Sequence, residues 1–136
     1  MKKLAKAALA ASVFFIPNIA NAAPPDGTYT GTVAFTNGPT LVCQLSFRLS
    51  GGGTVVDNVT MMSADPLCSS IAFQNQPYSA AFSGSGSGFY AIAGVNVTFI
   101  IPPSCSGIIL GTWSGSTIDI NTTIGSCGMV GTVSYP

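Results

Sequence analysis

The segment from residue 41 to residue 49 alternates between apolar and polar side chains, and this alternation constrains the fold more than any other feature. The apolar residues at every second position are Leu41, Cys43, Leu45, Phe47 and Leu49. The polar residues between them are Gln44, Ser46 and Arg48. Because successive side chains of a strand point to opposite faces, this period of two predicts a β-strand with one buried face.

Similar short segments follow along the chain, separated by turns rich in glycine, proline, serine and asparagine. Strands are predicted at residues 28–35, 54–62, 67–73, 78–83, 89–101, 108–114, 117–124 and 129–135, with a bulge at Gly94. No segment shows helical periodicity bounded by caps. We therefore predict an all-β fold, a single antiparallel β-sandwich or barrel of about 8–10 short strands.

The first 22 residues have the three parts of a secretory signal peptide. The positive start contains Lys2, Lys3 and Lys6, and an apolar stretch covers residues 7–16. Ala20-Asn21-Ala22 fits a cleavage site. The apolar stretch is about half the ~20 residues that a spanning helix needs, so we expect no retained transmembrane anchor. The prediction is a signal peptide at residues 1–22 and a single β domain at residues 23–136, secreted or at the cell surface.

Ionisable side chains are scarce, at 6% of the 136 residues against about 25% in average proteins. The chain has no histidine, which excludes enzymes that depend on a histidine base or a histidine-bound metal. Beyond the signal peptide, Arg48 is the one cationic side chain, beside Asp26, Asp57, Asp65 and Asp119. One cation cannot hold a nucleic acid by charge, so we predict no nucleic-acid partner.

The same scarcity leaves few groups for catalysis. A serine hydrolase needs a histidine or lysine base, and neither remains after the signal peptide. Asp57 and Asp119 both fall in strands, and whether they face each other as a carboxylate pair stays open. Asp26 and Asp65 lie in turn sequences, and no D-x-D-x-D run supports a calcium site. We predict that the protein is not an enzyme and holds no metal or cofactor.

Cys43, Cys68, Cys105 and Cys127 all lie beyond the signal peptide, and their even number in a small exported domain predicts two disulfides. Four cysteines allow three connectivities. We favour Cys43–Cys68 and Cys105–Cys127, since each bond would join neighbouring strands within one half of the chain. A zinc site is disfavoured because CxxC spacing and histidine are both missing.

Two aromatic residues are candidates for contact with a surface or a ligand. Trp113 lies in the sequence Gly111-Thr112-Trp113-Ser114-Gly115, and Tyr135 is the penultimate residue. Aromatic rings on a surface can bind sugars or hydrocarbon, but they more often fill a core. For Trp113 we favour packing in the core over exposure.

The strand edges of this chain lack the usual protection. Exposed edges normally carry lysine or another charge that prevents pairing with a second molecule. Beyond the signal peptide the chain has no lysine. Its edges are therefore either covered within a closed barrel, or they pair with another chain or meet an apolar phase.

Two parts of the chain carry a family resemblance. The first comprises Cys105-Ser106-Gly107, Gly111-Thr112-Trp113, Ile118-Asp119-Ile120 and Cys127-Gly128-Met129-Val130-Gly131-Thr132-Val133. The second is Leu41-Val42-Cys43-Gln44-Leu45-Ser46-Phe47. These blocks resemble the alkane oxidation protein activator family, the Pra proteins. The resemblance implies an exported bacterial protein that promotes growth on alkanes, with relatives tied to biofilm and surface attachment, and it brings no catalytic motif.

These observations together predict a non-enzymatic extracellular accessory protein that acts at hydrophobic surfaces. Its expected partners are hydrophobic surfaces or alkanes, with self-association as a further option. One alternative is a fimbrial or adhesin-type fibre subunit, because the alternating residues 132–135 resemble the closing strand of chaperone–usher pilins. A less favoured alternative is a carbohydrate-binding β-sandwich module that uses Trp113.

Overall fold

A computed structural model describes residues 23–62, 66–98 and 104–135, and these residues form nine β-strands and one short 3-10 helix. The strands are β1 (Gly27–Thr36), β2 (Thr40–Ser50), β3 (Val55–Met62), β4 (Ala72–Gln74), β5 (Tyr78–Phe82), β6 (Ser87–Thr98), β7 (Cys105–Ser114), β8 (Thr117–Ile124) and β9 (Cys127–Ser134). The 3-10 helix η1 (Cys68–Ser70) precedes β4. The predicted signal peptide and the last residues of the strand predicted at 89–101 lie outside the described residues.

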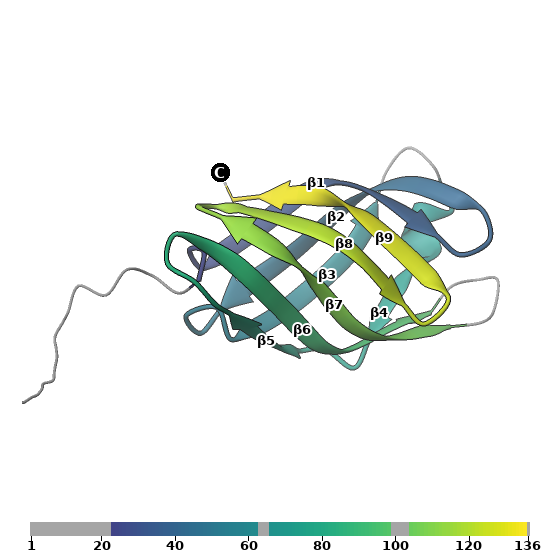
Figure 1. The fold of residues 1–136 in the computed structure, drawn as a ribbon. Coiled ribbons are helices and arrows are strands. Elements are labelled where there is room, and N and C mark those ends of the chain that lie inside the picture. Colours follow the sequence, from purple (N-terminus) through teal and green to yellow (C-terminus); the bar gives the residue numbers. More distant parts are fainter. Residues whose placement is uncertain (1–22, 63–65, 99–103, 136) are drawn as a thin grey trace, which may run out of the picture.

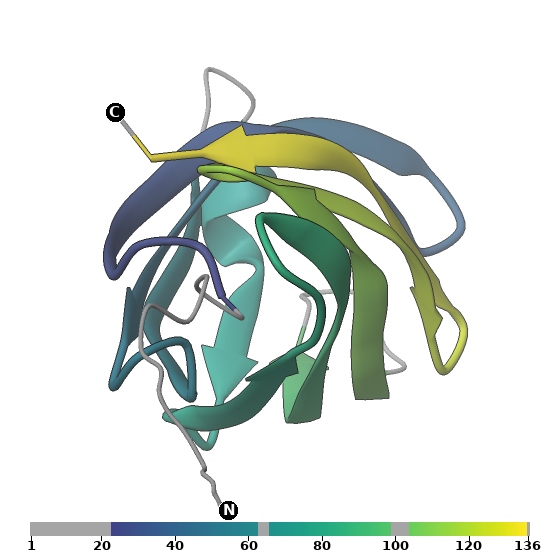
Figure 2. The same cartoon turned by 60° about the vertical axis from the view of Figure 1, so that its left-hand side comes forward.

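The strands pair in a closed antiparallel ring (Figures 1 and 2). β1 pairs with β2 and with β9, and the pairing continues through β8 and β7 to β6. On the other side β2 pairs with β3, and both β3 and β6 pair with β4 and β5. β4 and β5 share one position in the wall, so the nine strands form an eight-stranded up-and-down barrel.

The all-β prediction is confirmed, and of its two architectures the structure is the barrel. The sandwich alternative is wrong because hydrogen bonds run from strand to strand around the whole ring. The bulge at Gly94 is also present: the register between β6 and β7 shifts between Ile92 and Val95. Gly94 has a φ of 74°, a conformation that glycine adopts without strain.

The alternation that predicted the strand at residues 41–49 places its apolar side chains inside the barrel. The five apolar residues Leu41, Cys43, Leu45, Phe47 and Leu49 are at most 6% exposed. They join inward-facing side chains of the other strands in one core. The gap that remains in the middle of this core is about 20 Å³, room for about one water molecule. Side chains therefore fill the barrel.

Inward-facing glycines let neighbouring strands of the wall approach closely. A Cβ atom at Gly131 of β9 would lie 2.4 Å from the carbonyl oxygen of Thr32 in β1. One at Gly111 of β7 would lie 2.2 Å from the carbonyl oxygen of Asp119 in β8. Tyr90 of β6 lies opposite Gly111, and its hydroxyl donates to that same carbonyl oxygen at 2.7 Å. Burial raises the pKa of Tyr90, so the hydroxyl remains a donor that ties β6 to β8.

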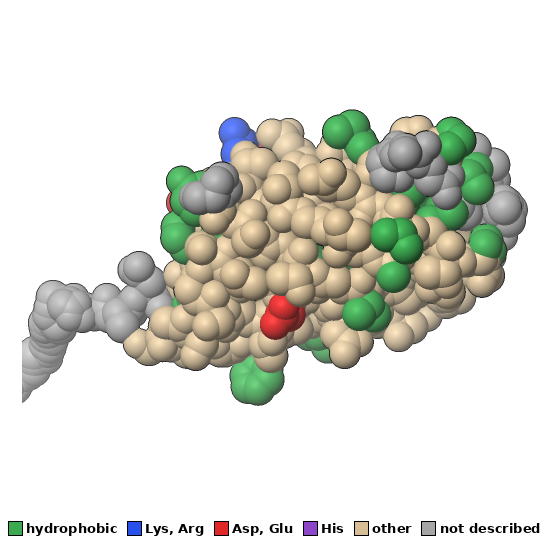
Figure 3. All heavy atoms as spheres, turned by 90° about the horizontal axis from the view of Figure 1, so that it is seen from above, with side chains coloured by type: hydrophobic (Ala, Val, Ile, Leu, Met, Phe, Trp, Pro, Cys, Tyr) green, Lys and Arg blue, Asp and Glu red, His purple; other side chains and the backbone are tan. Residues whose placement is uncertain are grey.

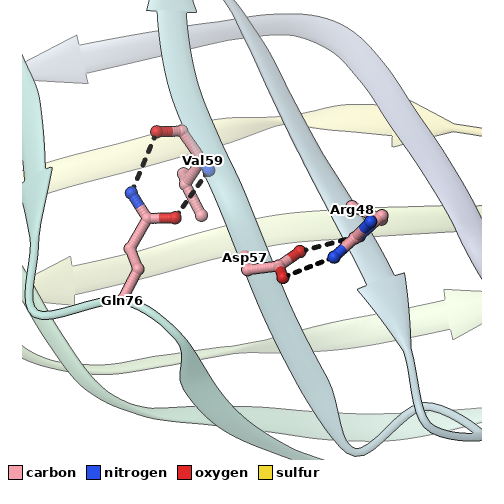
Figure 4. Close-up of polar contacts among 4 residues, drawn as sticks. All are labelled: Arg48, Asp57, Val59 and Gln76. Carbon is pink, nitrogen blue, oxygen red and sulfur yellow. Dashed lines mark hydrogen bonds and ion pairs between the residues drawn. The ribbon is translucent and has the colours of Figure 1, made fainter.

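The barrel wall is interrupted between β4 and β5, and the side chain of Gln76 bridges this interruption (Figure 4). The side-chain oxygen of Gln76 accepts a hydrogen bond from the N–H of Val59 in β3 at 2.8 Å. The amide nitrogen of Gln76 donates to the carbonyl oxygens of Val59 and Phe73, at 3.3 and 2.9 Å. Next to Val59, Asn58 has a φ of 53°, where β3 bulges against β2. The Gln76 amide thus replaces the backbone partner that the interrupted strand does not supply.

Two disulfides lie at one end of the barrel. Cys43 of β2 is bonded to Cys68 of η1, with Cα atoms 5.7 Å apart. Cys105 of β7 is bonded to Cys127 of β9, with Cα atoms 6.0 Å apart. These are the pairs favoured from the sequence. The strand predicted at residues 67–73 is reduced to β4, because the chain turns at η1 where Cys68 meets the wall.

The segment before β1 lies at the opposite end of the barrel. There the Asp26 carboxylate accepts hydrogen bonds from the N–H groups of Gly52 and Gly53, both at 3.1 Å. The Tyr29 hydroxyl donates to the carbonyl oxygen of Pro25 at 2.5 Å. Burial, together with the charge of Asp26, raises the pKa of Tyr29 to about 12 and so keeps this donor protonated. Through its hydrogen bonds to Gly52 and Gly53, the Asp26 carboxylate holds the turn between β2 and β3.

Substitution Gly131→Ala tests the close approach of β9 to β1. The new Cβ atom would meet backbone atoms of Thr32 and Val33 at 2.4 and 2.6 Å, so we expect the free energy of unfolding in urea to fall by about 3 kcal/mol. Gly128→Ala in the same strand is the matched control, because its Cβ atom would meet nothing nearer than 3.8 Å. The control should change stability by no more than about 0.5 kcal/mol. Equal losses for the two variants would contradict the close approach.

Substitution Gln76→Glu tests the side-chain amide that closes the wall. The introduced carboxylate can accept from Val59 but cannot donate to the two carbonyl oxygens, so at neutral pH the free energy of unfolding should fall by about 2 kcal/mol. The facing carbonyls raise the pKa of the introduced carboxyl, and its protonated form donates. Urea unfolding should therefore show a smaller loss at acidic pH than at neutral pH, each relative to wild type.

The control for this substitution is Gln74→Glu, which changes an exposed amide whose partner is the Thr98 hydroxyl. It should have little effect at either pH, since a hydroxyl can donate to a carboxylate. A loss in Gln76→Glu that does not depend on pH, or an equal loss in the control, would rule out the role given to Gln76.

Candidate functional site

The charged side chains have separate partners. The Arg48 guanidinium of β2 donates to both carboxylate oxygens of Asp57 in β3, at 3.0 and 2.8 Å, and these hydrogen bonds raise the pKa of Arg48 (Figure 4). Asp119, on the outer face of β8, accepts a hydrogen bond from the Thr132 hydroxyl at 2.8 Å. β3 and β8 are not neighbours in the ring, so Asp57 and Asp119 do not form a carboxylate pair. Asp65 lies outside the described residues.

Residues 23–62, 66–98 and 104–135 contain no group of three or more histidine, cysteine or acidic residues that could hold a metal ion. Within the same ranges, no helix is long and apolar enough to cross a membrane. The remaining candidates for a functional site are aromatic and aliphatic side chains of the barrel wall.

Trp113 lies in the core and Tyr135 lies at the surface. The Trp113 side chain is 3% exposed, and its Nε1 donates to the carbonyl oxygen of Ser83 at 2.9 Å while its ring packs edge-on against Phe82. This is the core location favoured from the sequence, and it removes the ring from contact with a surface or ligand. Tyr135 is 37% exposed, and its ring centroid is 5.7 Å from that of Tyr29.

Large apolar side chains project from the outside of the barrel. Five of them, each between 50 and 61% exposed, are here called the apolar band: Val42, Met62, Ile108, Leu110 and Val130. Phe89 is 70% exposed and lies nearer the other end of the barrel. Figure 3 shows such apolar groups on a surface that is otherwise made mostly of uncharged polar side chains and backbone.

The strand pairing brings members of the apolar band together. Val130 of β9 pairs with Ala34 of β1, and Ala34 pairs with Val42 of β2. Ile108 and Leu110 are two residues apart on β7, so both point outward. Val130, Ala34 and Val42 therefore form a continuous row over β9, β1 and β2, and Met62 continues it at the end of β3. Ile108 and Leu110 on β7 are separated from this row by β8, where Asn121 pairs with Val130.

Charge and exposed apolar surface are separated along the barrel. Arg48 and Asp57 lie near the end of β2 and the start of β3, beside the turn that Asp26 holds. Val42 and Met62 lie at the opposite ends of these two strands, toward the disulfides. In Figure 3 the blue group lies toward the left of the barrel and the larger red group lies near its middle, while green groups occur on both sides. Val42 and Met62 thus lie at the disulfide end and Arg48 and Asp57 at the other, which also carries the exposed Phe89.

The apolar band was not predicted from the sequence. A signal was present in β2, where Val42 occupies an outward position between two inward side chains, Leu41 and Cys43. A second was present in β7, where Leu110 follows the inward Ile109. A large aliphatic residue at an outward position of an otherwise alternating strand is the pattern that would have identified these residues.

A family model described as alkane oxidation protein activator PraA/PraB-like matches residues 1–136. The match includes both cysteine pairs and every member of the apolar band, and it confirms the resemblance seen in the two sequence blocks. No curated protein and no solved structure matches the chain significantly.

Trp113 is the one tryptophan of the chain, so tryptophan fluorescence tests its location. A buried indole predicts blue-shifted emission and weak quenching by iodide in the folded protein, and red-shifted emission with strong quenching after unfolding in urea. N-acetyltryptophanamide in the same buffers supplies the reference for a fully exposed ring. Emission and quenching like this reference in the folded protein would contradict the core location.

Proposed function

The chain belongs to the PraA/PraB-like family of alkane oxidation protein activators, and from this premise we propose that it is an exported accessory protein that contacts alkane surfaces through the apolar band. In this proposal the protein carries out no chemistry itself. It adsorbs to hydrocarbon outside the cell and makes the alkane more accessible to the enzymes that oxidise it.

The observation that carries the proposal is the contrast between a filled interior and an apolar exterior. The gap in the core is about 20 Å³, whereas pockets for small organic ligands are typically several hundred Å³. The side chains of the apolar band are between 50 and 61% exposed. A carrier that encloses an alkane needs a large apolar cavity inside and a polar surface outside. Contact through the outer wall therefore suits this molecule better.

The exposed area is large enough for reversible adsorption. Removing a half-exposed aliphatic side chain from water contributes roughly 1 kcal/mol, so the five side chains together contribute roughly 5 kcal/mol before the costs of adsorption. The closed wall and the two disulfides oppose spreading of the core over the hydrocarbon. We therefore expect the protein to adsorb in its folded state.

The charge distribution supports the same orientation. Arg48, Asp57 and Asp26 lie toward the end of the barrel opposite Val42 and Met62, so they can stay in water while this part of the band meets hydrocarbon. Asp119 is the described charge that borders the band, beside Leu110 and Val130. Neighbouring adsorbed molecules repel each other only weakly, because the exported chain carries few charges. A dense protein layer on the droplet is the expected result.

Two features support export. The N-terminal sequence predicts a signal peptide, and the barrel carries two disulfides, which form and persist in oxidising compartments.

The strand pairing does not support the fibre-subunit alternative. Exchange of strands between subunits needs an unpaired edge, and each described strand has a hydrogen-bonded neighbour on both sides.

The proposal is tested with a variant that removes three members of the apolar band, Val42→Ser, Met62→Ser and Ile108→Ser. Purified exported protein is mixed with hexadecane droplets, and both the bound fraction and the interfacial tension are measured. The loss of roughly 3 kcal/mol of apolar contact should lower the partition coefficient about 100-fold.

A matched control replaces three exposed threonines outside the band, Thr28→Ser, Thr30→Ser and Thr60→Ser, and should partition like wild type. Thermal unfolding establishes that both variants are folded. If the folded band variant lowers interfacial tension and binds droplets as well as wild type does, the outer wall is not the contact surface.

A further inference from the structure

A groove of about 690 Å³ crosses the outer wall from β6 to β9. Its floor includes the backbone of Gly111 and Gly131, where the strands approach closely. One wall is a row of outward side chains that face one another in register across the four strands. This row consists of Phe89 and three polar residues, Thr112, Asp119 and Thr132. The opposite wall consists of Leu110, Asn121 and Val130.

Asp119 gives the groove its charge. One carboxylate oxygen accepts from the Thr132 hydroxyl at 2.8 Å, and the other is 3.5 Å from the Thr112 hydroxyl. Each carboxylate oxygen can accept more than one hydrogen bond, so both keep capacity for a ligand donor. The one cation in the described ranges, Arg48, is bound to Asp57 on β3, and it does not neutralise Asp119. The groove therefore favours a ligand that donates hydrogen bonds and carries no negative charge.

Phe89 gives the groove a flat apolar face at its β6 end. Its side chain is 70% exposed, the largest exposed fraction among the large hydrophobic residues of the described chain. The backbone beneath it is fixed, because the neighbouring Tyr90 points inward and its hydroxyl is bonded to β8. An exposed aromatic ring beside a carboxylate and hydroxyls can hold a molecule that has one apolar face and polar edges.

The length of the groove suits a chain of linked rings. Neighbouring strands lie about 4.8 Å apart, so a groove across four strands is roughly 14 Å long. It is open to solvent along this length, with polar and aliphatic walls facing each other. Linked sugar rings combine these properties, since their edges carry hydroxyls and their faces carry C–H groups.

We propose that this groove binds an uncharged saccharide chain that lies across β6, β7, β8 and β9. Ring hydroxyls donate to Asp119 and exchange hydrogen bonds with Asn121, and one ring face packs on Phe89. The groove shares Leu110 and Val130 with the apolar band, whereas Asp119 and Phe89 lie outside the band. Val42, Met62 and Ile108 do not line the groove, so they stay available for hydrocarbon while a saccharide is bound, and one molecule would then hold polysaccharide to hydrocarbon.

Other occupants fit the groove less well. A fatty acid or an acidic polysaccharide would bring its carboxylate toward Asp119, with no cation between them in the described residues. A plain alkyl chain would cover Asp119 and two threonine hydroxyls without giving them a partner, which costs free energy. A twofold contact with a second copy would bring two Asp119 carboxylates into one desolvated region.

The test is a titration of the isotope-labelled exported protein, followed by amide chemical shifts. The probes are uncharged hexasaccharides of glucose, mannose and galactose, with hexagalacturonate as the anionic comparison. We expect at least one uncharged probe to shift the amides of residues 110–112, 119–121 and 130–132, and hexagalacturonate to bind more weakly. Asp119→Asn should weaken the binding about tenfold and Phe89→Ala about fivefold.

Met62→Ala is the matched control, since Met62 is 61% exposed but lies outside the groove, and it should leave saccharide affinity unchanged. The inference is overturned if no uncharged probe shifts the groove amides, if hexagalacturonate binds as well as the best uncharged probe, or if Asp119→Asn and Phe89→Ala keep wild-type affinity. The variant of Val42, Met62 and Ile108 separates the two proposals. If wild type binds a saccharide but does not bind hexadecane droplets, the saccharide site is supported and the proposed contact with alkane fails.

Discussion

The hydrogen bonds between β1 and β9 close the barrel, and the rest of the structure depends on this closure. Closure gives each described strand a neighbour on both sides, which protects edges that have almost no charged residues to guard them. It also brings the inward side chains together until a gap of only about 20 Å³ remains. Gly31 and Gly131 make the closure of the barrel possible, because a Cβ atom at either position would collide with the backbone of the facing strand.

A closed and filled barrel meets a partner through its outer surface and not through its interior. On the outer wall we propose two contacts of different chemistry, hydrocarbon on the apolar band and hydroxyl-rich molecules in the groove with Asp119. Both lie on strands whose inner faces are anchored in the core, so adsorption need not disturb the fold. The two disulfides hold the end that carries Val42 and Met62, where the wall would be exposed most directly to a hydrocarbon phase.

Local patterns predicted the strands, because an alternation such as that of β2 reflects one buried face and needs no knowledge of the partner strand. The choice of barrel over sandwich depends on the pairing of β1 with β9, which are far apart in sequence, and no local pattern contains it. The contact of Gln76 with Val59 could not be predicted either, because it also joins residues that are distant in the sequence. In the candidate site, Trp113 stood out by composition yet is core. Val42 was missed although the alternation of its strand marks an outward position, and Phe89 was missed because the adjacent aromatic Tyr90 leaves the local pattern open as to which ring points inward.

The central claim is that hydrocarbon contacts the outside of a closed barrel. Photolabelling tests it most directly: an alkyl diazirine is dissolved in hexadecane droplets that carry the adsorbed protein, and labelled residues are mapped by mass spectrometry. The account predicts labels on Val42, Met62, Ile108, Leu110 and Val130, which are exposed. Labels concentrated on the inward residues Val56, Ile92, Ile118 and Met129 would show that alkane enters or opens the barrel, and would contradict it.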